Sequence, residues 1–129
     1  MSHDELKKLL TRRYRFGAEF FEVGVRARFK CEYCDKDLLA SVDLYEYHWE
    51  REHVIPTARG GADEFENLAF SCRTCNQLKS DWNPAEAAPA DATRGDLVSI
   101  ARDYLQELRA ERQTELAEVR RLIQAELAL

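Results

Sequence analysis

The sequence predicts an α+β fold in which a small mixed domain is followed by one long helix. Three observations predict it. The pattern Cys-x-x-Cys occurs twice, at Cys31/Cys34 and at Cys72/Cys75. Between the pairs, strand-forming segments alternate with turn-forming ones, and a short helix-forming segment follows the second pair. From Asp96 to Leu127 the chain holds neither Gly nor Pro, a composition that favours a single helix.

The chain of 129 residues is the size of one ordinary domain, and its composition is that of a globular protein, with 45% hydrophobic residues. We expect a domain at residues 1–83, a linker at 84–95 and a C-terminal helix at 96–129. No stretch reaches the roughly 20 apolar residues of a membrane span, and the first residues lack the layout of a signal peptide. We therefore expect a cytoplasmic protein without a membrane partner.

Two features stand out in the N-terminal quarter. Apolar residues recur at roughly helical spacing from Asp4 to about Val25, which predicts one or two short helices interrupted near Gly17. Basic residues also gather there, although the net charge of −5 argues mildly against binding to nucleic acid. A local basic face on an acidic protein would be formed by Lys7, Lys8, Arg12, Arg13, Arg15, Arg26, Arg28 and Lys30.

The segment between the cysteine pairs reads as strand, loop and strand, with a helix after it. Residues 45–55 are rich in aromatic and β-branched types and stop at Pro56, which suits a strand. Residues 57–63 contain Gly60-Gly61 and predict a loop. Residues 68–70 predict a second strand, and residues 73–79 a short helix.

The four cysteines are candidate ligands of one structural zinc ion. Two Cys-x-x-Cys turns that face each other supply the tetrahedron of sulfurs that zinc prefers, and in a reducing compartment this spacing favours metal binding over disulfides. A site of four thiolates has no open position for water, so this zinc would stabilise the fold and take no part in chemistry. Redox-active dithiols or unliganded thiols are the alternatives.

The order of motifs along the chain is more specific than any one of them. After Cys31-x-x-Cys34 come Glu52-His53-x-x-Pro56, then Gly60-Gly61, then Asn67-Leu68, then Cys72-x-x-Cys75-Asn76-x-x-Lys79. From about Val25 to Asp81, this string resembles the HNH endonucleases of the ββα-metal type. The resemblance implies a ββα-metal core around the zinc site, flanked by the N-terminal helical segment and the long C-terminal helix.

The resemblance also implies roles for individual residues. Hydrolysis of a phosphodiester needs an activated water and a cation that neutralises charge on the phosphate, and an imidazole suits the first task. His53 would be the general base, and Asn67 would brace the loop or orient the imidazole. Glu52 and Asn76 would hold one divalent cation, Mg²⁺ or Mn²⁺, because oxygen ligands favour these ions. Arg59 and Lys79 are candidate ligands of the phosphate backbone.

Simpler interpretations stand beside these roles. Arg59 and Lys79 could be solvated surface charges, and His53 a partly buried histidine without a function. Adjacent residues of a strand point to opposite faces, so Glu52 and His53 reach one substrate together only if the strand end twists or the metal lies at its edge. If the register of the strand differs, Glu50 or Glu46 could stand in for Glu52, because a shift of one residue turns every side chain to the opposite face.

The preferred interpretation is a metal-dependent endonuclease that cleaves DNA and leaves 5′-phosphates. A zinc-stabilised module that binds nucleic acid or protein without cleaving is the second interpretation. A third places the function in the C-terminal helix, whose apolar stripe would pair with a partner or with a second copy of the chain, giving a homodimer.

Overall fold

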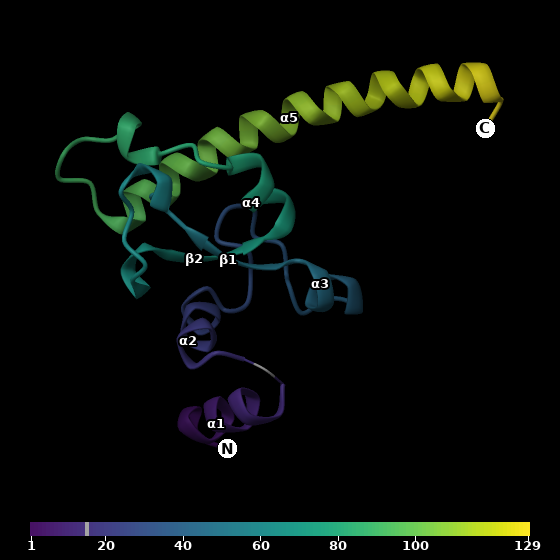
Figure 1. The fold of residues 1–129 in the computed structure, drawn as a ribbon. Helices are drawn as coiled ribbons and strands as arrows, with labels where there is room; N and C mark the ends of the chain where they lie inside the picture. Colours follow the sequence, from purple (N-terminus) through teal and green to yellow (C-terminus); the bar gives the residue numbers. More distant parts are fainter. Residues whose placement is uncertain (15) are drawn as a thin grey trace.

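The computed structural model describes residues 1–14 and 16–129; Arg15 of the expected basic face lies outside them. A two-stranded antiparallel sheet is at its centre (Figure 1). Strand β1 (Trp49–His53) pairs with β2 (Leu68–Cys72) in a register that sets Trp49 opposite Cys72 and His53 opposite Leu68. Helix α4 (Arg73–Lys79) follows β2 directly and contacts both strands. The expected α+β fold with its ββα core is confirmed.

The N-terminal segment is helical, as expected, and consists of α1 (His3–Arg13) and α2 (Ala18–Arg26). Helix α1 begins at a capping box in which Ser2 and Glu5 satisfy each other's backbone N–H groups. Helix α2 packs on β2 with its apolar face, where Phe21 and Val23 are fully buried. Two of the expected basic residues are engaged here: Lys7 pairs with Glu22, and Arg26 lies over Phe65.

The expected strand over residues 45–55 is too long at both ends, because β1 ends at His53. Residues Val42–Tyr47 form the short helix α3, and the strand begins only at Trp49. The reason lies upstream, where the Ser41 hydroxyl accepts a hydrogen bond from the backbone N–H of Leu44 and so caps a helix. The aromatic residues therefore belong to two elements. Trp49 packs at the centre of an aromatic cluster with Phe16, Phe20, Phe29, Tyr45 and Phe70.

The C-terminal helix α5 (Arg94–Leu127) is the longest element and begins two residues earlier than expected. Thr93 and Asp96 form the capping box that fixes its start. Residues 84–95, expected to be a linker, include the 3₁₀ helix η3 (Pro84–Ala87), which contacts α5. Nearby, the rings of Trp82 and Tyr104 stack with their centroids 3.9 Å apart. This contact packs the first half of α5 against the segment that follows α4.

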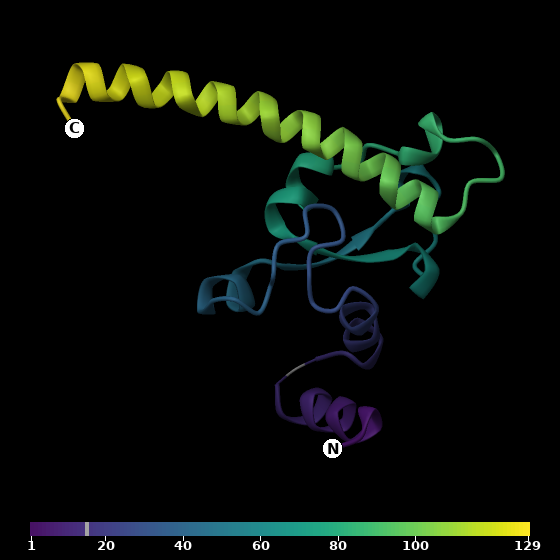
Figure 2. The ribbon, with the colours of Figure 1, turned by 180° about the vertical axis from the view of Figure 1, so that it is seen from behind.

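The two halves of α5 differ in their surroundings. In the first half, Ala101 and Leu105 are buried in the core against the sheet and the cysteine turns. From residue 110 onward every residue is exposed, and the helix projects away from the rest of the molecule, as both views show (Figures 1 and 2). Within the described residues, no helix is both long and apolar enough to cross a membrane.

Candidate active site and metal centre

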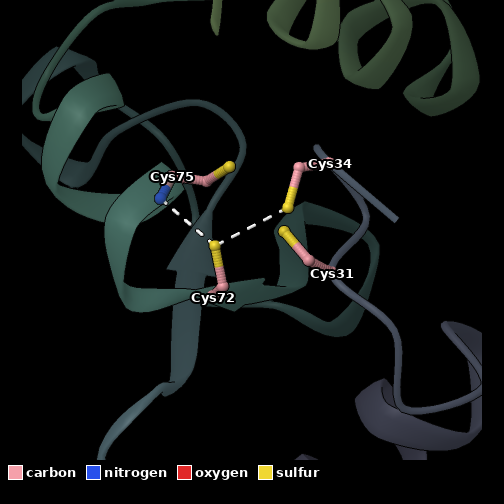
Figure 3. Close-up of side chains that lie close together, drawn as sticks. All are labelled: Cys31, Cys34, Cys72 and Cys75. Atoms are coloured by element: carbon pink, nitrogen blue, oxygen red, sulfur yellow. Dashed lines mark hydrogen bonds between the residues drawn. The ribbon is translucent and has the colours of Figure 1, made fainter. Parts of the chain in front are cut away.

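The four cysteines come together from two turns that are far apart in the sequence (Figure 3). The first turn closes through the backbone N–H of Asp35 to the Cys31 carbonyl, with Asp35 in the left-handed conformation. In the second turn, Cys72 ends β2 and caps α4, and its Sγ accepts a hydrogen bond from the backbone N–H of Cys75 at 3.3 Å. Local backbone geometry thus directs each sulfur toward the others.

The sulfur positions suit a tetrahedral zinc ion. All four Sγ atoms lie within 4.8 Å of one another, and those of Cys34 and Cys72 are 3.8 Å apart. Zn–S bonds near 2.3 Å in a tetrahedron place sulfurs about 3.8 Å apart. Cys31, Cys72 and Cys75 are buried and Cys34 is half-buried. Four thiolates fill the coordination sphere, so a zinc ion bound here would be structural, as expected from the spacing.

His53 lies at the end of β1 and is held by a residue that the sequence did not single out. Its Nε2 is 2.9 Å from a carboxylate oxygen of Asp63, and the same oxygen forms an ion pair with Arg51 at 2.7 Å. The hydrogen bond with His53, and next that from Arg51, hold the pKa of Asp63 below its ordinary value. A carboxylate only accepts, so Nε2 carries the proton, and in the neutral form of the ring Nδ1 is then the acceptor nitrogen.

The loop that brings Asp63 back to His53 is braced by Asn67. The Asn67 side chain accepts from the backbone N–H of Ile55 at 2.9 Å and donates to the carbonyls of Ile55, at 2.9 Å, and Ala62, at 2.8 Å. Two glycines make this closure feasible. Gly60 has a φ of +88°, and a Cβ on Gly61 would lie 1.7 Å from the Ile55 carbonyl oxygen.

Glu52 points the other way and forms a buried ion pair. One carboxylate oxygen accepts from Lys79 Nζ at 2.7 Å and the other from the hydroxyl of Tyr33. The residue exposures are 4% for Glu52 and 1% for Lys79. Lys79 Nζ also donates to the His53 carbonyl at 3.1 Å. This network joins the first cysteine turn, β1 and α4, and fixes the backbone at His53.

Burial shapes the protonation of this network. Burial, followed by the charge of Glu52 and its hydrogen bond, raises the pKa of Tyr33 well above its ordinary value, so the hydroxyl stays a donor. Burial also raises the pKa of Glu52, and the charge of Lys79 opposes that shift. The carboxylate, ammonium and hydroxyl therefore satisfy one another in a region that excludes water.

This geometry argues against two of the expected roles. Both oxygens of Glu52 are taken by Lys79 and Tyr33, so the carboxylate does not fit a catalytic Mg²⁺ or Mn²⁺ in this arrangement. Lys79, with its ammonium group buried beneath β1, is not placed to contact DNA. The period of two along β1 accounts for the outcome, because it turns Glu52 inward toward α4 and His53 outward toward Asp63.

The remaining expected site residues lie around this centre. Asn76 is half-buried on α4, one turn before Lys79, so the two share the face that meets β1. Arg59 is exposed on the 3₁₀ turn η1 (Thr57–Arg59), and its guanidinium is 3.5 Å from a carboxylate oxygen of Asp81. That long and exposed contact leaves Arg59 available to another anion.

Asp63 and Tyr33 are the site residues that the sequence did not reveal. The one signal for Asp63 was its place just after Gly60-Gly61, in a loop that must return toward β2. Tyr33 stands inside the first Cys-x-x-Cys pair, where its spacing indicates only a turn residue. Their contacts are tertiary and join residues that are 10 and 19 positions apart.

Residues 31–81 match the protein-family model described as HNH endonuclease. The match spans both cysteine turns, the sheet and α4, and ends at Asp81. The matched family is the one that the order of the motifs indicated. Neither a curated protein nor a solved structure matches the chain.

The metal centre predicts that the protein contains one zinc ion per chain and loses its cooperative unfolding without it. A structural zinc bound by thiolates contributes folding free energy directly. We expect 1,10-phenanthroline to lower the melting temperature sharply and added Zn²⁺ to restore it, as measured by circular dichroism and elemental analysis. A fully cooperative, unchanged melt of metal-free protein would contradict the assignment.

The buried pair predicts a specific pattern of stabilities. Glu52→Leu or Lys79→Met alone leaves an unpaired buried charge and should lower the free energy of unfolding by about 3–5 kcal/mol. The double variant should lose less than either single variant, as measured by urea denaturation. Arg59→Ala removes an exposed pair and serves as the control, with an expected loss of about 1 kcal/mol or less. Additive losses in the double variant would show that the two charges are not coupled.

Proposed function

We propose that the protein is an endonuclease that hydrolyses phosphodiester bonds in DNA with His53 as its general base. The observation that carries the proposal is the His53–Asp63 contact on the solvent side of β1, within a domain of the HNH family. His53 is 22% exposed, enough to meet a substrate while its ring is held in place. The cleavage products would carry 5′-phosphates.

Each residue around His53 has a task in this proposal. His53 Nδ1 takes the proton from the attacking water, and Asp63 holds the ring and stabilises the imidazolium that forms. Asn67 keeps the loop closed so that Asp63 stays within reach of Nε2. Arg59, exposed beside the loop, would hold a phosphate of the backbone. Lys79 acts on His53 only through its carbonyl.

The resemblance implies a divalent cation, Mg²⁺ or Mn²⁺, on Glu52 and Asn76. The buried pair of Glu52 with Lys79 does not fit that role. The half-buried amide of Asn76 remains the candidate ligand from this pair, since an amide oxygen suits these ions. A dependence of cleavage on Mg²⁺ or Mn²⁺ is therefore part of what the activity assay measures.

The activity prediction is that the purified protein nicks supercoiled plasmid and that His53→Ala slows nicking by on the order of 10²–10⁴-fold. Asp63→Asn should also slow nicking, but less than His53→Ala does, because the base remains and only its orienting carboxylate is gone. His48→Ala, which changes a neighbouring histidine, is the matched control and should cut like the wild type. Nicking is measured by agarose gel electrophoresis.

The conditions of that assay need one precaution. A chelator would also strip the structural zinc, so the state without Mg²⁺ or Mn²⁺ is prepared by omitting these ions. A wild type that leaves DNA intact with either ion, or a His53→Ala variant that cuts equally fast, would overturn the proposal. Binding of labelled duplex DNA without cleavage would favour the non-catalytic binding module.

We further propose that α5 pairs with α5 of a second copy. Its exposed half carries an apolar stripe that continues the line of the buried Ala101 and Leu105. Charges of both signs flank the stripe, so two copies do not repel each other strongly. A helical segment of this length is marginal in water unless its apolar stripe is covered. The exposed stripe consists of Leu116, Val119, Leu122, Ile123 and Leu127.

The dimer prediction can be checked with a pair of matched variants. Leu116→Glu with Ile123→Glu places charge on the stripe and should convert the dimer to a monomer in light scattering coupled to size-exclusion chromatography. Thr114→Glu with Ala117→Glu adds the same charge on the side of α5 away from the stripe and should leave the dimer intact. A wild type that is monomeric at high concentration would remove the proposal.

A further inference from the structure

Helix α5 touches the metal centre although it lies outside the matched residues 31–81. Arg109 Nη2 is 3.2 Å from Cys75 Sγ and 3.5 Å from Cys72 Sγ, within the range of N–H···S hydrogen bonds. Its side chain is part-buried between α5 and the second cysteine turn. The C-terminal helix therefore places a cationic donor directly on two of the four sulfurs.

A second arginine, Arg102, holds the same helix on the first cysteine turn without touching sulfur. It donates to both carboxylate oxygens of Asp35, at 2.6 and 3.1 Å, and to the Glu32 carbonyl at 2.7 Å. Arg102 and Arg109 are seven residues apart, so they lie on one side of α5. Arg102 thus binds α5 to the first cysteine turn, and Arg109 donates to the sulfurs of the second turn.

The charge of the centre explains what Arg109 contributes. Four thiolates around Zn²⁺ carry a net charge of −2, and three of the four cysteines are buried. A guanidinium within hydrogen-bond distance offsets part of that charge and draws electron density from the sulfurs. Outer partners of metal ligands affect metal affinity by about 10- to 100-fold.

The surroundings of Cys34 show where the centre is open. Cys34 is half-buried, and it lines a hollow of about 330 Å³ together with Tyr33, Asp35, Arg102, Leu105 and Arg109. This hollow gives a competing chelator or an electrophile a route to the sulfur of Cys34. Arg109 lines this hollow and lies beside the sulfurs of Cys72 and Cys75.

We propose that Arg109 is an outer-sphere residue of the zinc centre, which protects the Cys72 and Cys75 thiolates and slows the loss of the metal. Helix α5 then has a task besides packing, because it keeps the structural zinc in the domain. The proposal rests on the zinc site and not on nuclease activity. It stands or falls independently of His53.

The test measures zinc release from the full chain to the chromogenic chelator 4-(2-pyridylazo)resorcinol. Arg109→Met keeps most of the aliphatic stem and removes the donors, and it should release zinc about 10-fold faster than the wild type. Arg109→Lys keeps a charged donor and should be intermediate. Arg112→Met, one turn further along the exposed part of α5, is the matched control and should equal the wild type.

Two further measurements separate hydrogen bonding from helix docking. Arg102→Met weakens the docking of α5 but leaves the sulfur contacts, so it should release zinc more slowly than Arg109→Met. In protein loaded with Co²⁺, loss of the N–H···S bonds makes the thiolates richer in electrons. The thiolate-to-cobalt charge-transfer band should therefore shift to longer wavelength in Arg109→Met and stay in place in Arg102→Met.

Two outcomes would overturn the proposal. Equal release rates in Arg109→Met and Arg112→Met would show that the sulfur contacts do not protect the metal. Equal acceleration by Arg102→Met and Arg109→Met, with no shift of the cobalt band, would show that helix docking alone is responsible. If Arg109→Met fails to fold, the release rate and the cobalt band of Arg109→Lys decide between the same outcomes.

Discussion

The cluster of four cysteine sulfurs is the constraint on which the rest of the structure depends. A two-stranded sheet is marginally stable in water by itself, and β1 and β2 form the only sheet among the described residues. The cysteine turns join the start of the domain to the junction of β2 and α4. Because β2 is fixed at Cys72, its pairing with β1 also sets the position of His53, which lies opposite Leu68.

The alternation of side chains along β1 points two neighbouring residues to opposite faces of the sheet. Glu52 turns inward and is neutralised by Lys79 and Tyr33, and His53 turns outward to Asp63. The buried pair contributes to the site indirectly, because Lys79 also holds the His53 carbonyl. Glu52, which the resemblance assigns to a metal ion, is thus part of the network that holds the backbone at His53. A buried ion pair costs desolvation, and its use here is to fix one arrangement of strand and helix.

The sequence predicted what is encoded locally. Cysteine spacing predicts the cluster of four sulfurs, the composition of residues 73–79 predicts a helix, and the order of motifs predicts the match to the HNH endonuclease model. What it could not predict depends on tertiary contacts. The Glu52–Lys79 pair joins residues 27 positions apart, and Asp63 reaches His53 only because Gly60, Gly61 and Asn67 close the loop. The helix over Val42–Tyr47 was hidden because strand-forming aromatic residues outweighed the capping signal of Ser41.

The central claim is that the fold holds His53 as a general base, and chemical rescue tests it most directly. His53→Gly leaves a space beside Asp63 into which free imidazole can diffuse. We expect this variant to be nearly inactive on plasmid DNA and to regain part of its nicking activity as imidazole is added, whereas the wild type does not respond. A His53→Gly variant that cuts as fast as the wild type without imidazole, or that stays inactive at every imidazole concentration, would contradict the claim.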